Sequence, residues 1–263
     1  MSESIRHPAV AGSFYPSDPE ELRAMVRGFL GAAARDAPPS KAMILPHAGL
    51  IYSGPIAATG YALLEPIRST IRRVVLLGPA HRHYFAGLAA PTVDRFRTPL
   101  GEVPIDRDAI DAIAGLEQVK RLDAAHDHEH RLEVHLPFLQ MQLDEFKLVP
   151  LVVGEAGHDE VAEVIERLWG GSETLIVISS DLSHFEEYAQ ARSHDRSTAD
   201  RIESLHDEEI GPRDACGCVP IAGLLKVARR KRLHPVTLDL RNSGDTAGPR
   251  SEVVGYGAFV LRD

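Results

Sequence analysis

Short apolar runs alternate along this chain with segments in which apolar residues recur every three or four positions. Buried strands read as continuous apolar runs. Three such runs stand out, at Ala42–Leu45, Arg73–Gly78 and Leu175–Ser180. The remaining predicted strands are Gly87–Pro91, Lys147–Val153, Val236–Leu240 and Val253–Leu261, with a hairpin at Phe96–Ile105.

Helical spacing fills most of the intervals between these runs. One helix begins after Ser17 or Asp18, with Pro19 at its first position. The others are predicted at Pro55–Leu64, Arg107–Leu116, Glu160–Trp169, Tyr188–Leu205 and Val219–Arg230, and in the polar-to-amphipathic segment Ala125–Leu143. Alternating strands and helices predict an α/β fold, a three-layer sandwich around a central sheet. The two closing strands are nearly adjacent in the sequence, so the sheet is predicted to be mixed.

Each of the three apolar core runs ends in a polar loop that carries a histidine. His47 follows the first run, His81 the second, and Asp181 and His184 the third. Ligands of open α/β sheets bind beyond the carboxyl ends of the strands. We therefore expect these histidines to meet at one edge of the sheet. For each histidine taken alone, the simpler interpretation is a side chain that caps its own loop.

The two cysteines, Cys216 and Cys218, are separated by one residue and are poorly placed for an unstrained disulfide. Cys216 precedes the helix predicted from Val219, whose unpaired N–H groups should lower the pKa of the thiol. Its alternative role is that of a small buried residue. With His47 and His81, a Cys216 thiolate would complete a three-ligand site with open positions. This set has the charge of the two-histidine, one-carboxylate site of non-haem Fe(II) oxygenases, although the softer sulfur makes Cu and Zn competitors.

Asp181 and His184 are candidates for catalytic roles beside such a site. Asp181 either orients His184, reaches the metal itself, or caps a helix that begins with Ser183. His184 is predicted to act as a general acid or base next to a metal-bound substrate.

The tract from His126 to His135 resembles a metal cluster but contains no H-E-x-x-H zinc motif. His130 and Glu133 lie one helical turn apart and could face the site together, whereas His126 and His128 are expected to be solvated. The sequence leaves open whether Cys218, His130, Glu133 or His135 contributes to the site.

The length, composition and net charge of the chain exclude several classes of protein. The 263 residues and 44% hydrophobic content suffice for a sizeable core. No linker or internal repeat divides the chain, so one domain is expected over residues 1–263. The net charge of −9 argues against non-specific binding of nucleic acid. Without a signal peptide or a membrane-length apolar run, a cytoplasmic protein with no membrane partner is expected. Walker, dinucleotide-binding and nucleophile-elbow motifs are absent from the sequence.

Ordered motifs from end to end resemble those of the Memo family, named for a mediator of cell motility and including prokaryotic relatives. They are R-H-P-A-V-A-G-S-F-Y-P at Arg6–Pro16, P-H-A-G-L-I-Y-S-G at Pro46–Gly54, L-G-P-A-H at Leu77–His81, E-H-R-L-E-V-H-L-P-F-L at Glu129–Leu139, S-S-D-L-S-H at Ser179–His184, A-C-G-C-V-P-I at Ala215–Ile221, N-S-G-D at Asn242–Asp245 and V-V-G-Y at Val253–Tyr256.

This resemblance implies a fold similar to the class III extradiol ring-cleaving dioxygenases, which hold Fe(II) with two histidines and a glutamate. Carried over by motif, it implies His47, His81 and Cys216 as metal ligands, with Cys216 at the glutamate position. It places His184 at the acid/base position, with Asp181 close by. The neighbouring Cys218 departs from the simple pattern and leaves open which thiol faces the metal.

The resemblance also implies partners. Prokaryotic relatives are grouped with a radical-SAM protein in the AmmeMemoRadiSam system, as its protein B type, and eukaryotic members are linked to phosphopeptide partners. A homodimer is expected by family analogy.

Three functions follow as hypotheses. The first is a redox enzyme dependent on non-haem iron, Fe(II), or on copper, acting with O₂ on a small or peptide-borne aromatic substrate. The second is a non-catalytic metal- or peptide-binding module with a vestigial dioxygenase pocket. The third is a zinc hydrolase, because a three-ligand zinc site with an open position can activate water.

Overall fold

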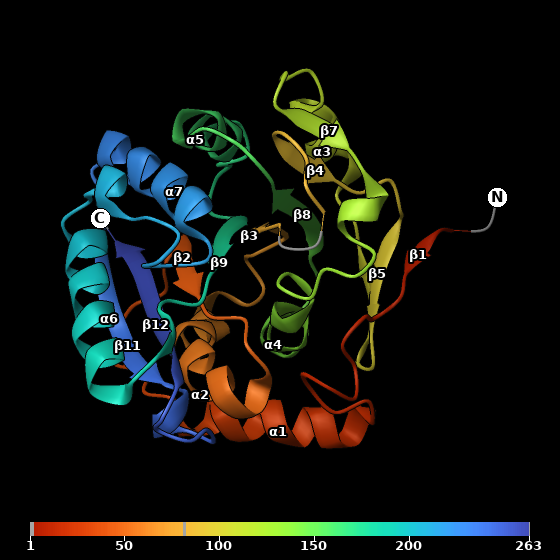
Figure 1. Cartoon of the computed structure of the whole chain (residues 1–263). Helices are drawn as coiled ribbons and strands as arrows, with labels where there is room; N and C mark the ends of the chain where they lie inside the picture. The colour runs from red at the N-terminus through yellow and green to blue at the C-terminus, as the bar shows by residue number, and fades with distance from the viewer. Residues whose placement is uncertain (1–2, 81–82, 263) are drawn as a thin grey trace.

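The computed structural model describes residues 3–80 and 83–262 and arranges them around a large mixed sheet (Figure 1). In spatial order its strands are β10 (His184–Glu186), β12 (Val253–Arg262), β2 (Ala42–Leu45), β9 (Thr174–Ser179), β3 (Arg73–Pro79), β8 (Lys147–Val153), β4 (Leu88–Ala90) and β7 (Val119–Arg121), with β11 (His234–Asn242) paired to β12.

The centre of this sheet is parallel and its flanks are not. Strands β2, β9, β3 and β8 are parallel neighbours, while β12 pairs antiparallel with β2 and β4 pairs antiparallel with β8. Every residue of β2 and β9 is buried, as expected for strands covered on both faces. The mixed sheet predicted from the closing strands is therefore confirmed.

Helices cover both faces of the sheet and complete the predicted three-layer sandwich. Helix α2 (Leu50–Tyr61) packs against β2 and β12 on one face, together with α1 (Pro19–Ala32) and α4 (Leu136–Gln142). In Figure 1, α1 runs along the bottom of the molecule beneath these two helices.

The opposite layer contains α5 (His158–Arg167), α6 (Tyr188–Glu203) and α7 (Cys218–Lys231). Helices α5 and α7 pack side by side, whereas α6 lies against β11 and β12 (Figure 1). Helix α3 (Arg107–Ile113) contacts α5 and β8. A small separate sheet is formed by β1 (Ile5–Arg6), β5 (Arg95–Thr98) and β6 (Gly101–Pro104), the last two forming the predicted hairpin.

Two helix predictions need correction. Helix α2 begins at Leu50 rather than near Pro55, which lies inside it. The amide of Leu50 donates to the carbonyl of Phe14, and this contact fixes the chain where the helix starts. Pro55 has no N–H, so the helix lacks only the one backbone hydrogen bond that this residue would otherwise donate. The predicted helix at Ala125–Leu143 shrinks to α4, preceded by short 3₁₀ turns at Asp123–Ala125 and Glu133–His135.

The reason for the second difference is a set of buried polar side chains before α4. Glu133 is fully buried, pairs with Arg6, accepts a hydrogen bond from the Tyr15 hydroxyl, and accepts the amides of Ala9 (2.7 Å) and Val10 (3.1 Å). A buried carboxylate is tolerated only with such partners. Glu133 therefore ties the N-terminal segment to the core, and the interpretation in which it faces the candidate site with His130 is wrong.

His126 is likewise internal, with 2% exposure, so the expectation that it is solvated is also wrong. Its Nε2 lies 3.0 Å from the Ala89 carbonyl and donates to it. Burial lowers the pKa of His126 to about 4. His128, as expected, is exposed.

Among residues 3–80 and 83–262, no helix has the length and apolar character required to cross a membrane.

We expect Glu133→Gln to destabilise the protein by about 3 kcal/mol, because the substitution leaves the buried Arg6 guanidinium without its counter-charge. Urea unfolding followed by circular dichroism measures the change. Glu145→Gln is the control, since Glu145 is exposed and its loss should change the unfolding free energy by less than about 0.5 kcal/mol. Equal effects of the two substitutions would contradict the anchoring role of Glu133.

The low pKa of His126 predicts a pH dependence of stability. Its pKa of about 4 in the folded chain lies below the ordinary value of 6.5, so the unfolded chain binds the proton first. The unfolding free energy should therefore fall as pH drops from about 6.5 to about 4. In His126→Gln this part of the decline should disappear, which urea titrations at several pH values measure. Parallel pH profiles for the two proteins would exclude His126 as the cause.

Candidate functional site

The candidate site forms where the parallel strands end. Leu45 of β2 is paired with Ser179 of β9, so His47 and Asp181 each lie two residues beyond neighbouring strand ends. Strand β3 pairs with β9 on its other side and ends at Pro79. His81 follows β3 in the sequence but lies outside the described residues, so its place in the site stays a prediction.

Cys216 reaches the same edge of the sheet from the loop before α7. Its amide donates to the Asp181 carbonyl (3.2 Å), and the amide of Gly217 donates to Ser180 Oγ (2.9 Å). Gly217 packs so closely on β9 that a Cβ atom would lie 2.7 Å from Ser180 Cβ and 2.8 Å from the Ser179 carbonyl oxygen. Only glycine permits this approach, which holds the neighbouring cysteine against the strand ends.

The structure brings three of the predicted site residues together. His47 Nε2 lies 3.5 Å from Cys216 Sγ and 3.8 Å from Asp181 Oδ2. The amide of Asp181 also donates to Cys216 Sγ at 3.3 Å. His47 is more than 130 positions from either partner in the sequence, yet its Nε2 lies within 4 Å of the Cys216 sulfur and of an Asp181 carboxylate oxygen.

A hydrogen-bond network fixes the ring of His47. Ser179 Oγ donates its single hydrogen to the Arg131 carbonyl (2.8 Å), so it accepts from both His47 Nδ1 (2.7 Å) and His135 Nε2 (2.8 Å). His47 therefore carries its proton on Nδ1. The lone pair of Nε2 then points toward Cys216, as a metal-ligating histidine requires.

His135 and Tyr61 complete this network, and the sequence analysis assigned neither to it. The Tyr61 hydroxyl donates to His135 Nδ1 (2.8 Å), and the Tyr61 ring stacks on Phe138. Complete burial lowers the pKa of His135 to about 3, so its ring stays neutral. The apolar run that follows His135 in the sequence is a signal of its burial, but nothing in the sequence indicates its partners.

Asp181 holds the His47 loop in place. Its Oδ1 accepts the amide of His47 at 2.8 Å, and the amide of Ala48 also donates to this carboxyl group. Burial raises the pKa of Asp181 to about 6 despite these hydrogen bonds. The alternative in which Asp181 caps a helix starting at Ser183 is wrong, because the chain enters strand β10 at His184 instead.

The expected low pKa of Cys216 is also wrong. Burial, reinforced by the nearby Asp181 carboxyl group, raises the pKa of the thiol to about 12 and outweighs the opposing effects of the Asp181 amide, the Ser180 hydroxyl and the Arg131 charge. Without a bound cation the side chain is therefore a neutral thiol. Cys218, the first residue of α7, is buried in the hydrophobic core, and Cys216 is the cysteine that borders the cavity described next.

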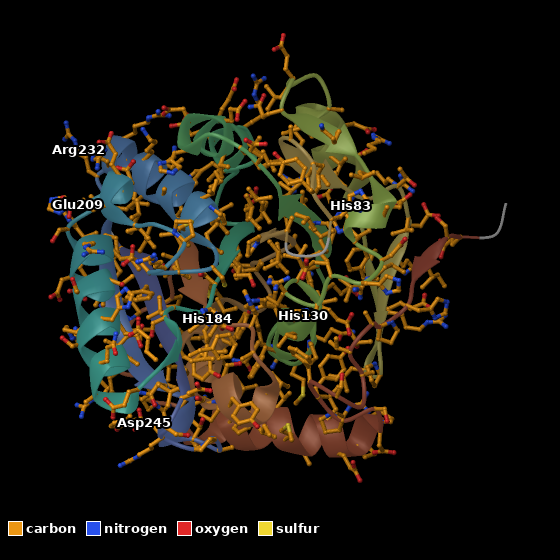
Figure 2. All side chains as sticks on the ribbon, in the orientation of Figure 1. His83, His130, His184, Glu209, Arg232 and Asp245 are labelled. Atoms are coloured by element: carbon orange, nitrogen blue, oxygen red, sulfur yellow. The ribbon has the colours of Figure 1, made fainter. Side chains whose placement is uncertain are left out.

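A central cavity of about 1190 Å³ opens above these groups, and Figure 2 shows His130 and His184 near the middle of the molecule, where both border it. His184 is exposed at the cavity wall and lies next to Phe185, which is 73% exposed. The sequence analysis missed most of the remaining wall, which comes from Phe14, Tyr52, Arg131, Arg213 and Tyr256. These residues belong to separate segments that only the fold brings together.

Within the described residues, no set of three His, Cys, Asp or Glu side chains is arranged to hold a metal ion. His47 and Cys216 are the two members of the predicted ligand set that lie within those residues.

The sequence profile of the family described as Memo-like protein matches residues 6–260. A MEMO1 family protein of Aquifex aeolicus is 37% identical over 98% of this chain and 99% of its own length. One from Methanopyrus kandleri is 38% identical over the same shares of the two chains.

Another MEMO1 family protein, from Archaeoglobus fulgidus, is 36% identical over 98% of this chain and 100% of its own length. Among solved structures, an uncharacterized protein of Escherichia coli K12 aligns with a TM-score of 0.47 and 12% identity, covering 82% of this chain and 98% of that one. The sequence matches span nearly the entire chain and exceed 30% identity. The chain therefore belongs to the Memo family.

Proposed function

We propose that this chain is a metal-binding protein whose central cavity serves redox chemistry dependent on non-haem iron or copper. The observation that carries the proposal is the pairing of His47 Nε2 with Cys216 Sγ at 3.5 Å, below a cavity large enough for a substrate. His81, as third ligand, is part of the proposal.

The spacing of His47 and Cys216 fits two ligands of one metal ion. Two ligands of one tetrahedral ion, with metal–nitrogen and metal–sulfur bonds of about 2.1 and 2.3 Å, lie about 3.6 Å apart. The observed separation of 3.5 Å agrees with this value. His47 also donates its other ring N–H to Ser179, the arrangement typical of ligating histidines. The donor set of imidazole and thiolate suits iron, copper and zinc.

Different side chains of the protein would have different roles around the ion. Bound Fe(II) or copper would supply electrons for O₂ chemistry at the base of the cavity. Asp181 Oδ2, buried beside His47, can accept a proton, because burial raises the pKa of its carboxyl group to about 6. His184, which is exposed and lines the cavity, would exchange a proton between substrate and solvent. The aromatic wall would exclude water from one side of the substrate.

A non-catalytic binding module is the second candidate. It is favoured by the width of the cavity and by Phe185, which stands exposed at its wall as an apolar contact for a peptide. Zinc hydrolysis is the third, and elemental analysis of protein purified without added metal separates it from the iron and copper proposals. Anaerobic loading with Fe(II), followed by O₂ and measurement of oxygen uptake, separates the redox enzyme from the binding module.

We expect Cys216→Ser to weaken Fe(II) binding by more than about 100-fold, because it removes the thiolate ligand. Competition with a coloured chelator under anaerobic conditions measures the affinity. Cys218→Ser is the matched control, since it removes the neighbouring thiol at the first residue of α7, which does not border the cavity, and it should leave the affinity unchanged. Wild-type affinity in Cys216→Ser would refute the proposed metal centre.

Ser179→Ala tests the role of the network behind His47. It removes the acceptor that fixes the histidine proton on Nδ1, so metal affinity should fall by about 10–100-fold. Ser40→Ala is the control. It removes a buried hydroxyl that lies just before β2, at the end of that strand away from His47, and that donates to the carbonyls of Ala42 and Leu261. The same chelator competition is used. Equal affinities for the two variants would show that Ser179 does not position the ligand.

A further inference from the structure

Arg131 is one of the residues that line the central cavity. Its side chain is only 10% exposed, and its Nη1 donates to Glu129 Oε1 at 2.6 Å. Within the described residues, its buried Nε has no hydrogen-bond partner. A buried N–H of a charged group without a partner is destabilising. Nε is closed to the cavity in this arrangement, so a small movement of the side chain that brings the guanidinium to an acceptor in the cavity would be favourable.

The position of Arg131 is rigid and close to the proposed metal centre. Its carbonyl accepts the hydroxyl of Ser179 at 2.8 Å, and the same hydroxyl oxygen accepts from His47 Nδ1. Its Cβ packs against β3, where a Cβ atom at Gly78 would lie 3.6 Å away. The guanidinium is thus carried by backbone that the His47 network itself holds in place.

We propose that the substrate of the central cavity carries a carboxylate and that Arg131 binds this carboxylate. The inference rests on the proposed function, because it names the substrate class of the same cavity. Arginine offers a planar fork of donors that matches a carboxylate with two parallel hydrogen bonds. Arg131 would orient the substrate relative to the metal and is therefore a specificity-determining residue.

The local charges favour a carboxylate over a phosphate. Glu129 is buried against Arg131 and already balances part of its charge. Asp181 contributes a second carboxyl group to the same cavity. A doubly charged phosphate would meet both of these groups, whereas a singly charged carboxylate adds only one negative charge to the arginine.

The cavity walls indicate the rest of the ligand. Phe14, Tyr52, Tyr256 and Phe185 line the same space as Arg131. Aromatic side chains bind flat apolar groups by stacked or edge-to-face contact. An aromatic carboxylate therefore matches both the aromatic walls and the charge of Arg131, and benzoate is its simplest probe.

The test is benzoate binding to the metal-free and the Fe(II)-loaded protein, measured by protein-observed NMR titration at fixed ionic strength. Arg131→Lys keeps a cation beside Glu129 but loses the fork, so benzoate should bind about tenfold more weakly. Arg232→Lys is the matched control, because Arg232 is exposed on the far end of α7 (Figure 2) and its replacement should leave the affinity unchanged. Benzamide, which is uncharged, and phenyl phosphate are titrated alongside.

Tight benzoate binding that weakens in Arg131→Lys but not in Arg232→Lys supports the proposal. Equal affinity of the wild type and Arg131→Lys for benzoate overturns it, as does equal affinity for benzamide and benzoate. Stronger binding of phenyl phosphate, lost in Arg131→Lys, would also overturn the carboxylate assignment. Fe(II) affinity of Arg131→Lys is measured separately. If the metal fails to bind to any of these proteins while benzoate binding still depends on Arg131, the proposed redox function fails and the carboxylate site stands.

Discussion

The parallel pairing of β2 with β9 is the constraint on which the candidate site depends. Because Leu45 is paired with Ser179, the loops that follow the two strands begin at the same level. His47 and Asp181 then meet through a backbone hydrogen bond, and Ser179 lies directly beneath the imidazole. A shift of this register by one residue would turn the Ser179 hydroxyl to the other face of the sheet and remove the acceptor that orients His47.

Buried polar groups, rather than surface contacts, connect this strand edge to the rest of the chain. The hydroxyl of Ser179 links His47, His135 and the carbonyl of Arg131 in a single network. In a low-dielectric interior such a network is rigid when every member is satisfied. Glu133 likewise connects the N-terminal segment to the core through buried hydrogen bonds and its ion pair with Arg6. The tract rich in histidine and glutamate thus serves mainly as internal support, with His130 and Arg131 facing the cavity.

Much of this architecture could be predicted from the sequence, since apolar runs mark buried strands directly. The predicted bounds of the strands Ala42–Leu45 and Lys147–Val153 are those observed. The convergence of His47, Asp181 and Cys216 followed from strand ends and from the family resemblance. What the sequence could not supply were the partners of buried polar residues, because Glu133 with Arg6 and Ser179 with His135 are joined only by the fold. The pKa of Cys216 was mispredicted for the same reason, since burial depends on neighbours distant in the sequence.

Strand β10 lies at the edge of the main sheet and is interrupted between His184 and Glu186. The residue between them, Phe185, has a left-handed backbone with φ of 58°, an unfavourable conformation for a bulky side chain. Irregularities of this kind keep an open sheet border from recruiting a strand of another molecule. The irregular backbone at Phe185, which lines the cavity, therefore also disfavours the addition of a further strand along that border.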